Sequence, residues 1–142
     1  MSLRRALALG VLCWLAGCSS IPLGPVRRPE LYPDRTSPEA AFATFLWAWN
    51  AGDVPVLRAV LGAWLRHDLE ERIARKGVEE TAAFYRGAGD LRLLDIEWRD
   101  VGEALAYVRA VLAGSAVPRA ELDFSLLRRP DGWVVTGKRL LR

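Results

Sequence analysis

The stretch SPEAAFATFLWAWNAGD, residues 37–53, predicts an apolar helix with a marked start and a marked end. Ser37 offers a hydroxyl N-cap, and Pro38 supplies the fixed φ of a first helical position. Gly52 is a typical C-terminal stop, and Asp53 can cap the next helix. Four large apolar residues share one face at helical spacing: Phe42, Phe45, Leu46 and Trp49. Because Trp47 lies on a second face, we expect this helix to be covered on more than one side.

Downstream, residues 54–73 continue the helical period with apolar residues three and four apart. Gly62 can divide this stretch into two helices. Charged pairs at i, i+4, such as Asp68 and Arg72, predict that its outer face is exposed to solvent. A short helix is expected over residues 78–85, before the Gly-Ala-Gly sequence at 87–89.

Beyond Asp90 the apolar period changes from about 3.6 to 2, which indicates strands. Four alternating runs follow one another, separated by turn signals such as Pro130-Asp131-Gly132. Consecutive strand–turn–strand units predict an antiparallel meander. We therefore expect an α+β fold, with N-terminal helices packed on a curved antiparallel sheet of about four strands.

Upstream, the first 18 residues resemble a bacterial lipoprotein signal peptide and its lipobox. Arg4 and Arg5 precede an apolar run that ends in Leu-Ala-Gly-Cys at residues 15–18, and the run is well short of the about 20 residues that span a bilayer. The resemblance implies cleavage after residue 17 and acylation of Cys18, with palmitate as a testable label. An ordinary cleaved signal and an uncleaved anchor are the alternatives. Stable anchoring follows from more than one acyl chain.

Three segments result: a signal peptide at residues 1–17, a lipidated cysteine with a proline-rich tether at 18–36, and one folded domain at 37–142. The serines after Cys18 resemble those of lipoproteins sorted to the outer membrane of diderm bacteria, facing the periplasm. Without Arg4 and Arg5, the chain has 18 basic and 17 acidic residues, and the basic residues do not gather in a stripe. We therefore expect a membrane-anchored envelope protein with no nucleic-acid partner.

The order of elements resembles the nuclear transport factor 2-like superfamily, which includes ketosteroid-isomerase-like and SnoaL-like proteins. The residues that carry the likeness are Ser-Pro-Glu-Ala-Ala at 37–41, Asn-Ala-Gly-Asp at 50–53, and the closing strand, Asp-Gly turn and Trp-Val-Val at 124–135. The resemblance implies a cone, in which a curved sheet wraps around helices. It implies little about activity, because unrelated functions share this fold.

No catalytic set of the superfamily matches residue by residue, so no catalytic residue and no cofactor are predicted. An isomerase or dehydratase would need a carboxylate such as Asp95 or Asp123 near Tyr85 or Tyr107 inside the cone. These carboxylates alternate with apolar residues and so are expected on a solvated face. One histidine and no cysteine in the mature chain cannot build a zinc site, and no metal is expected.

The leading functional prediction is a non-catalytic module that binds a small apolar molecule or an envelope protein, with an enzyme of the type above and a purely structural role as alternatives. The ligand-binding residues predicted are Trp47, Tyr85, Tyr107 and Arg109. Trp47 is expected to line a cavity between helix and sheet or to form the contact of a homodimer. The lipid partner is the membrane itself, reached through Cys18.

Overall fold

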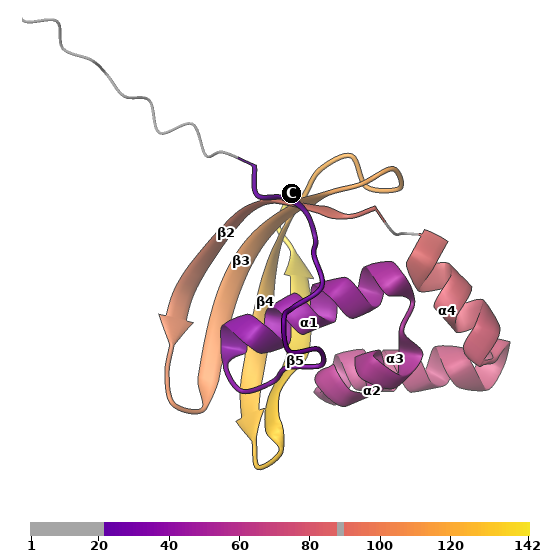
Figure 1. Ribbon diagram of the computed structural model, residues 1–142, viewed down its shortest axis with the longest axis horizontal. Coiled ribbons are helices and arrows are strands. Elements are labelled where there is room, and N and C mark those ends of the chain that lie inside the picture. The colour runs from indigo at the N-terminus through magenta and orange to yellow at the C-terminus, as the bar shows by residue number, and fades with distance from the viewer. Residues whose placement is uncertain (1–21, 88–89) are drawn as a thin grey trace, which may run out of the picture.

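A computed structural model describes residues 22–87 and 90–142 of the chain (Figure 1). The predicted signal peptide and Cys18 lie outside these residues, as does part of the Gly-Ala-Gly sequence at 87–89. No helix in the described ranges has both the length and the apolar character needed to cross a bilayer.

Four helices form the first part of the fold: α1 (Pro38–Ala51), α2 (Val54–Val60), α3 (Ala63–Lys76) and α4 (Val78–Gly87). The predicted caps are confirmed. The Ser37 hydroxyl accepts from the Ala40 amide at 3.1 Å, and Gly52 ends α1 in the left-handed conformation, with φ of 63°. A Cβ at Gly52 would lie 2.5 Å from the Ala82 carbonyl oxygen, so this glycine also allows α4 to approach α1 closely. The division at Gly62 is confirmed as well.

Five strands form one antiparallel sheet in chain order: β1 (Gly24–Pro25), β2 (Arg92–Val101), β3 (Leu105–Ala113), β4 (Ala120–Arg129) and β5 (Gly132–Leu140). The α+β class and the antiparallel meander are confirmed. The expected number of about four strands is wrong by one, because β1 adds to the edge of β2 through Gly24 and Leu93. Proline-rich sequence carries no strand period, so this two-residue strand was not predicted.

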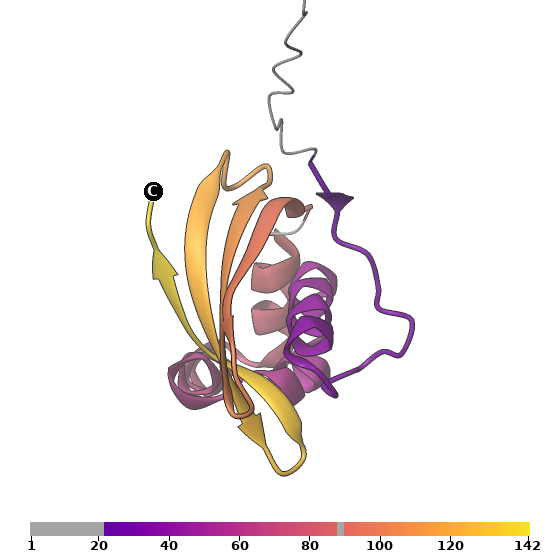
Figure 2. The ribbon, with the colours of Figure 1, turned by 90° about the vertical axis from the view of Figure 1, so that its left-hand side faces the viewer.

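The core lies between α1 and one face of the sheet (Figures 1 and 2). Phe42, Phe45 and Phe124 are each at most 2% exposed, and their rings pack with centroids 5.1–6.0 Å apart. Edge-to-face contacts of this kind add to the free energy gained by burying the rings. We call this face of the sheet the inner face and the opposite face the outer face.

Residues 24–36, here named the N-terminal strap, lie against the domain. The Tyr32 hydroxyl donates to Asp53 Oδ2 at 2.9 Å, and the Thr44 hydroxyl, which is fully buried, donates to the Asp34 carbonyl at 2.8 Å. Arg35 binds Asp131 in the β4–β5 turn at 2.9 Å. The proline-rich sequence predicts a tether over residues 18–36; from Gly24 onward this segment is docked on the domain.

A cavity on the inner face as candidate functional site

An apolar cavity of about 370 Å³ lies between α1 and the inner face of the sheet. Its wall on α1 is formed by Phe45, Leu46 and Trp49. The sheet and the β3–β4 loop supply the remaining lining residues: Leu91, Leu112, Val117, Ala120, Leu122, Phe124, Lys138 and Leu140. Ligand sites in proteins have volumes of this order and combine an apolar lining with a few polar groups. Lys138 is the one charged side chain in this lining.

Lys138 reaches the inner face because of a β-bulge in β5. Ser125 pairs with Gly137, but the next residue, Leu126, pairs with Val135, so that Thr136 is the extra residue. The Thr136 hydroxyl donates to the Ser125 carbonyl at 3.1 Å and holds the bulge in place. One extra residue exchanges the two faces of a strand. Val135 therefore faces the core, and beyond the bulge Lys138, opposite Phe124, also faces inward.

The Lys138 ammonium group sits 4.9 Å from the centroid of the Trp49 ring, a cation–π contact. None of the ion pairs formed within residues 22–87 and 90–142 includes Lys138. Partial desolvation by the cavity lowers the pKa of Lys138, and the distant carboxylate of Asp68 opposes this shift only in part. Lys138 is nevertheless exposed to solvent at the cavity mouth, so the desolvation of its ammonium is only partial. The site therefore presents a cation that an anionic ligand can neutralise.

Trp49, whose ring lines the cavity, also carries a buried polar group. Its indole Nε1 has almost no accessible surface and has no hydrogen-bond partner among the described residues. A buried N–H without an acceptor costs about 1–3 kcal/mol. Because this atom is closed off from solvent, the polar group that the lining offers to a ligand is the Lys138 ammonium.

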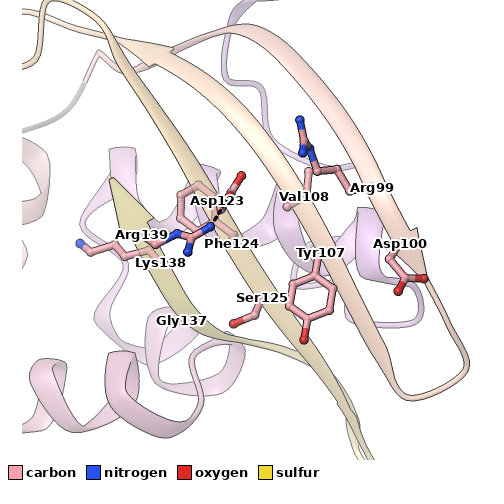
Figure 3. Close-up of a pocket in the computed structure, with 10 residues that line it drawn as sticks. All are labelled: Arg99, Asp100, Tyr107, Val108, Asp123, Phe124, Ser125, Gly137, Lys138 and Arg139. Carbon is pink, nitrogen blue, oxygen red and sulfur yellow. Dashed lines mark hydrogen bonds and ion pairs between the residues drawn. The ribbon is translucent and has the colours of Figure 1, made fainter. Parts of the chain in front are cut away.

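The outer face of the sheet is different in character. Arg109 binds Asp123 at 2.9 Å and Glu121 at 3.4 Å, and Arg139 binds Asp123 at 3.1 Å. The hydrogen bond from Arg109 is the main cause of the lowered pKa of Asp123. An open hollow of about 500 Å³ lies beside this ladder, where Gly137 leaves space next to Ser125 (Figure 3). Among the charged residues of its lining, Arg99 pairs with Glu97 and Arg139 with Asp123, whereas no ion pair within the described residues includes Asp100 or Lys138.

The structure does not bring the four predicted ligand-binding residues together. Trp47 is half-buried under the N-terminal strap, with its ring edge-on to Tyr32 at 6.3 Å. Tyr85 is buried on α4 against Trp49, at 4.8 Å between ring centroids, and burial raises its pKa. Tyr107 and Arg109 lie on the outer face, where Tyr107 lines the open hollow (Figure 3). The strap is thus what covers the second face of α1.

The carboxylates considered for an enzyme also lie away from the cavity. Asp95 is exposed, and Asp123 belongs to the outer-face ladder. The tyrosine–carboxylate pair formed by Tyr32 and Asp53 lies at the start of α2, where Asp53 also caps the helix. Within the described ranges, no group of three or more His, Cys, Asp or Glu side chains is placed to hold a metal ion.

Sequence reasoning missed Lys138 and assigned Trp49 to closed core. Alternation counted from Trp133 places odd-numbered residues of the last strand inside, and therefore Lys138 outside. The bulge reverses this order after Val135. A signal existed in the sequence, since Thr-Gly at 136–137 interrupts the apolar run, and glycine within a strand often marks a bulge.

Comparison with known proteins gives no family. No protein-family model matches the chain, and no curated protein sequence matches it. Among solved structures, a protein from Sphaerobacter thermophilus aligns over 75% of this chain and 98% of its own, with 15% identity and a TM-score of 0.48. A SEC-C motif containing protein from Rhodopseudomonas palustris aligns over 75% and 80%, with 14% identity and a TM-score of 0.47.

A third solved structure is a protein with unknown function from the DUF3225 family of Pectobacterium atrosepticum. It aligns over 73% of this chain and 88% of its own, with 19% identity and a TM-score of 0.49. Because all three TM-scores are below 0.5, no property of these proteins is assigned to this chain.

Proposed function

We propose that this protein is a lipid-anchored envelope protein that binds a small amphipathic molecule, with an apolar body and an anionic head, in the inner-face cavity. The observation that carries the proposal is Lys138, a cation without an ion-pair partner among the described residues, in an otherwise apolar lining. Its ammonium is partly desolvated, which lowers its pKa, and an anionic ligand would offset this cost.

The lining supports one class of ligand over others. Its apolar side chains match a hydrocarbon body, and removing such surface from water is worth about 25 cal/mol per Å². The ammonium group of Lys138 matches an anionic oxygen acceptor, such as a carboxylate. Among the described residues, the cavity lining includes no carboxylate that could act as the base of an isomerase, so we favour binding over catalysis.

The envelope location and the superfamily are part of the same proposal. The lipobox that ends at Cys18 supports the anchor, and the caps and the closing strands support a nuclear transport factor 2-like cone, with α1 lying over the inner face of the sheet. Sorting to the outer membrane of a diderm host is proposed from the serines that follow Cys18. Membrane fractionation of the host tests this sorting, and recovery in the inner membrane would refute it.

The experiment uses three probes with the same tail: dodecanoate, dodecanol and dodecyltrimethylammonium. Binding is measured by titration calorimetry, below micelle formation, on residues 18–142 with Cys18→Ser so that the chain carries no acyl group. Dodecanoate is expected to bind more tightly than the other two. Lys138→Met is expected to weaken dodecanoate binding by about tenfold or more, because a hydrogen bond to a charged group is worth about 1.5–3 kcal/mol.

The matched control is Arg139→Met, which removes a cation from the adjacent position on the outer face. This variant should bind dodecanoate as the parent does. Equal dodecanoate affinities for the parent and Lys138→Met would overturn the proposed role of Lys138. Failure of both dodecanoate and dodecanol to bind the parent would overturn the cavity as a ligand site.

A further inference from the structure

The cavity opens at the end of the sheet where the N-terminal strap begins. The strand register places the start of β2, the end of β3, the start of β4 and the end of β5 at the same end, since Arg92 pairs with Ala113, Leu112 with Ala120, and Leu122 with Leu140. Pro25 of β1 pairs with Arg92 at this end too. Figures 1 and 2 show the first described residues, the β3–β4 loop and the C-terminus together here. We call it the entry end.

The docked strap leaves a short connection to the proposed lipid. Gly24 pairs with Leu93, and only six residue steps separate it from Cys18. At no more than about 3.6 Å per residue, these steps span about 20 Å. The ten residues of β2 extend about 30 Å away from the entry end, at about 3.3 Å per residue. The sheet therefore cannot stand upright on its opposite end while Cys18 is inserted in the membrane.

The entry end also has the surface chemistry of a lipid contact. Leu23 is 58% exposed and Leu140 is 67% exposed. Three arginines at this end are exposed: Arg92, Arg119 and Arg142. Asp90 is the exposed acid nearby, and its carboxylate is engaged by the amide and hydroxyl of Ser115. Exposed leucines at both edges of the sheet, together with exposed arginines at the same end, suit a bilayer surface with anionic headgroups.

We infer that the entry end docks on an anionic bilayer surface, so that the mouth of the cavity faces the leaflet that holds the anchor. This inference rests on the proposed lipid anchor at Cys18 and deepens the proposed function, because the ligand would then enter from the membrane. Val117 in the β3–β4 loop and Leu140 at the end of β5 line the cavity at the entry end.

Orientation is tested with the acylated protein in vesicles of phosphatidylglycerol and phosphatidylcholine. Single cysteines are introduced by Ala116→Cys in the β3–β4 loop and by Glu103→Cys in the β2–β3 turn at the opposite end; both positions are exposed. Each cysteine carries an environment-sensitive fluorophore, and the vesicles contain a spin-labelled quencher lipid. The label at position 116 is expected to be quenched several-fold more than the label at position 103.

Charge is tested by Arg92→Glu combined with Arg119→Glu, against Arg128→Glu combined with Arg129→Glu at the opposite end. The first pair should reduce quenching at position 116, and the second should leave it unchanged. Equal quenching at positions 116 and 103, or stronger quenching at 103, would overturn the orientation. Vesicle flotation separates the two proposals: protein that floats without quenching at 116 refutes the orientation alone, and protein that does not float refutes the anchor and the orientation together.

Discussion

The two faces of the sheet differ in whether their cations have carboxylate partners. On the outer face, Arg109 is held by Asp123 and Glu121, and the outer-face carboxylates in turn hold Arg139. On the inner face, Lys138 lies over the Trp49 ring in an apolar lining. A cation with partners stabilises the fold that positions it, whereas a cation without them is costly. The charge without a partner, and not the larger cluster of charges, therefore marks the candidate ligand site.

The largest contrast between the faces is expected for adjacent residues of β4. Phe124 is 2% exposed and contacts both Phe42 and Phe45, so Phe124→Ala should cost about 3–5 kcal/mol, a large share of the about 5–15 kcal/mol of a typical domain. Ser125→Ala, on the outer face, should cost about 1 kcal/mol or less, the value of one hydrogen bond. Urea denaturation measures both. Similar losses would remove the distinction between the faces.

The second contrast is in the direction in which removing a cation changes the stability of the fold. Lys138→Met should raise the free energy of unfolding, and with it the urea midpoint, by less than about 1 kcal/mol of stability, because the ammonium is exposed to solvent. Arg109→Met should lower the midpoint, because it leaves the Asp123 and Glu121 carboxylates without their shared cation. A midpoint that falls in both variants would mean that Lys138 stabilises the fold, and its role as a ligand-binding group would lose its physical basis.

The third contrast is in pH dependence. The folded-state pKa of Lys138 is lowered, so its cost to stability is present at neutral pH and disappears as pH rises from that pKa towards the unfolded value of about 10.4. The stability gap between Lys138→Met and the parent should therefore narrow in alkali. Tyr32, whose pKa is raised mainly by burial, is present in both proteins. Its contribution therefore drops out of the difference between their two curves of stability against pH.

The outer face should respond in acid instead. The folded-state pKa of Asp123 is lowered, so its contribution is present above the unfolded value of about 3.9 and is lost as pH falls through the folded pKa. Asp123→Asn should flatten the acid limb of the stability curve and leave the alkaline limb unchanged. An unchanged acid limb would show that the ladder contributes nothing measurable.

The smallest effect on stability is expected at the two tryptophans of α1. Trp49→Phe removes a buried N–H without a partner but also removes packed surface, and these terms should offset to within about 1 kcal/mol. Trp47→Phe should be similarly mild, because a phenyl ring can keep the contact with Tyr32. Dodecanoate affinity should fall only in Trp49→Phe, because the Trp49 ring lines the cavity and contacts the Lys138 ammonium. Equal affinities in the two variants would exclude the indole ring from ligand binding.

Sequence patterns predicted the fold well where the signal is local. Ser37, Gly52 and Gly62 mark helix ends through backbone geometry, and the period of two beyond Asp90 predicts strands whatever the tertiary structure. Long-range pairing has no such signal. The docking of Gly24 on Leu93, of Tyr32 on Asp53 and of Arg35 on Asp131 depends on residues 21 to 96 positions apart that meet only in the folded chain.

The candidate site was predicted less well for the same reason. The sequence predicts a cavity wall on α1 and favours Trp47 for it, because Trp49 shares a face with Phe42 and Phe45 and was therefore expected in the packed core. The structure has the strap over Trp47 and the cavity beside Trp49. Which face of a helix is left incompletely covered depends on what packs there, and that is a property of the whole fold.

The bulge at Thr136 lets the final strand lose one codon without changing its faces. Deleting Thr136 would remove the extra residue and leave Val135 opposite Leu126 and Gly137 opposite Ser125, so every later residue would keep its present face. An exchange of faces needs the opposite change, in which Thr136 stays and joins the regular pairing; Lys138 would then turn to the outer face and Arg139 to the cavity. The bulge, and not the length of the strand, therefore decides which of these two cations reaches the cavity.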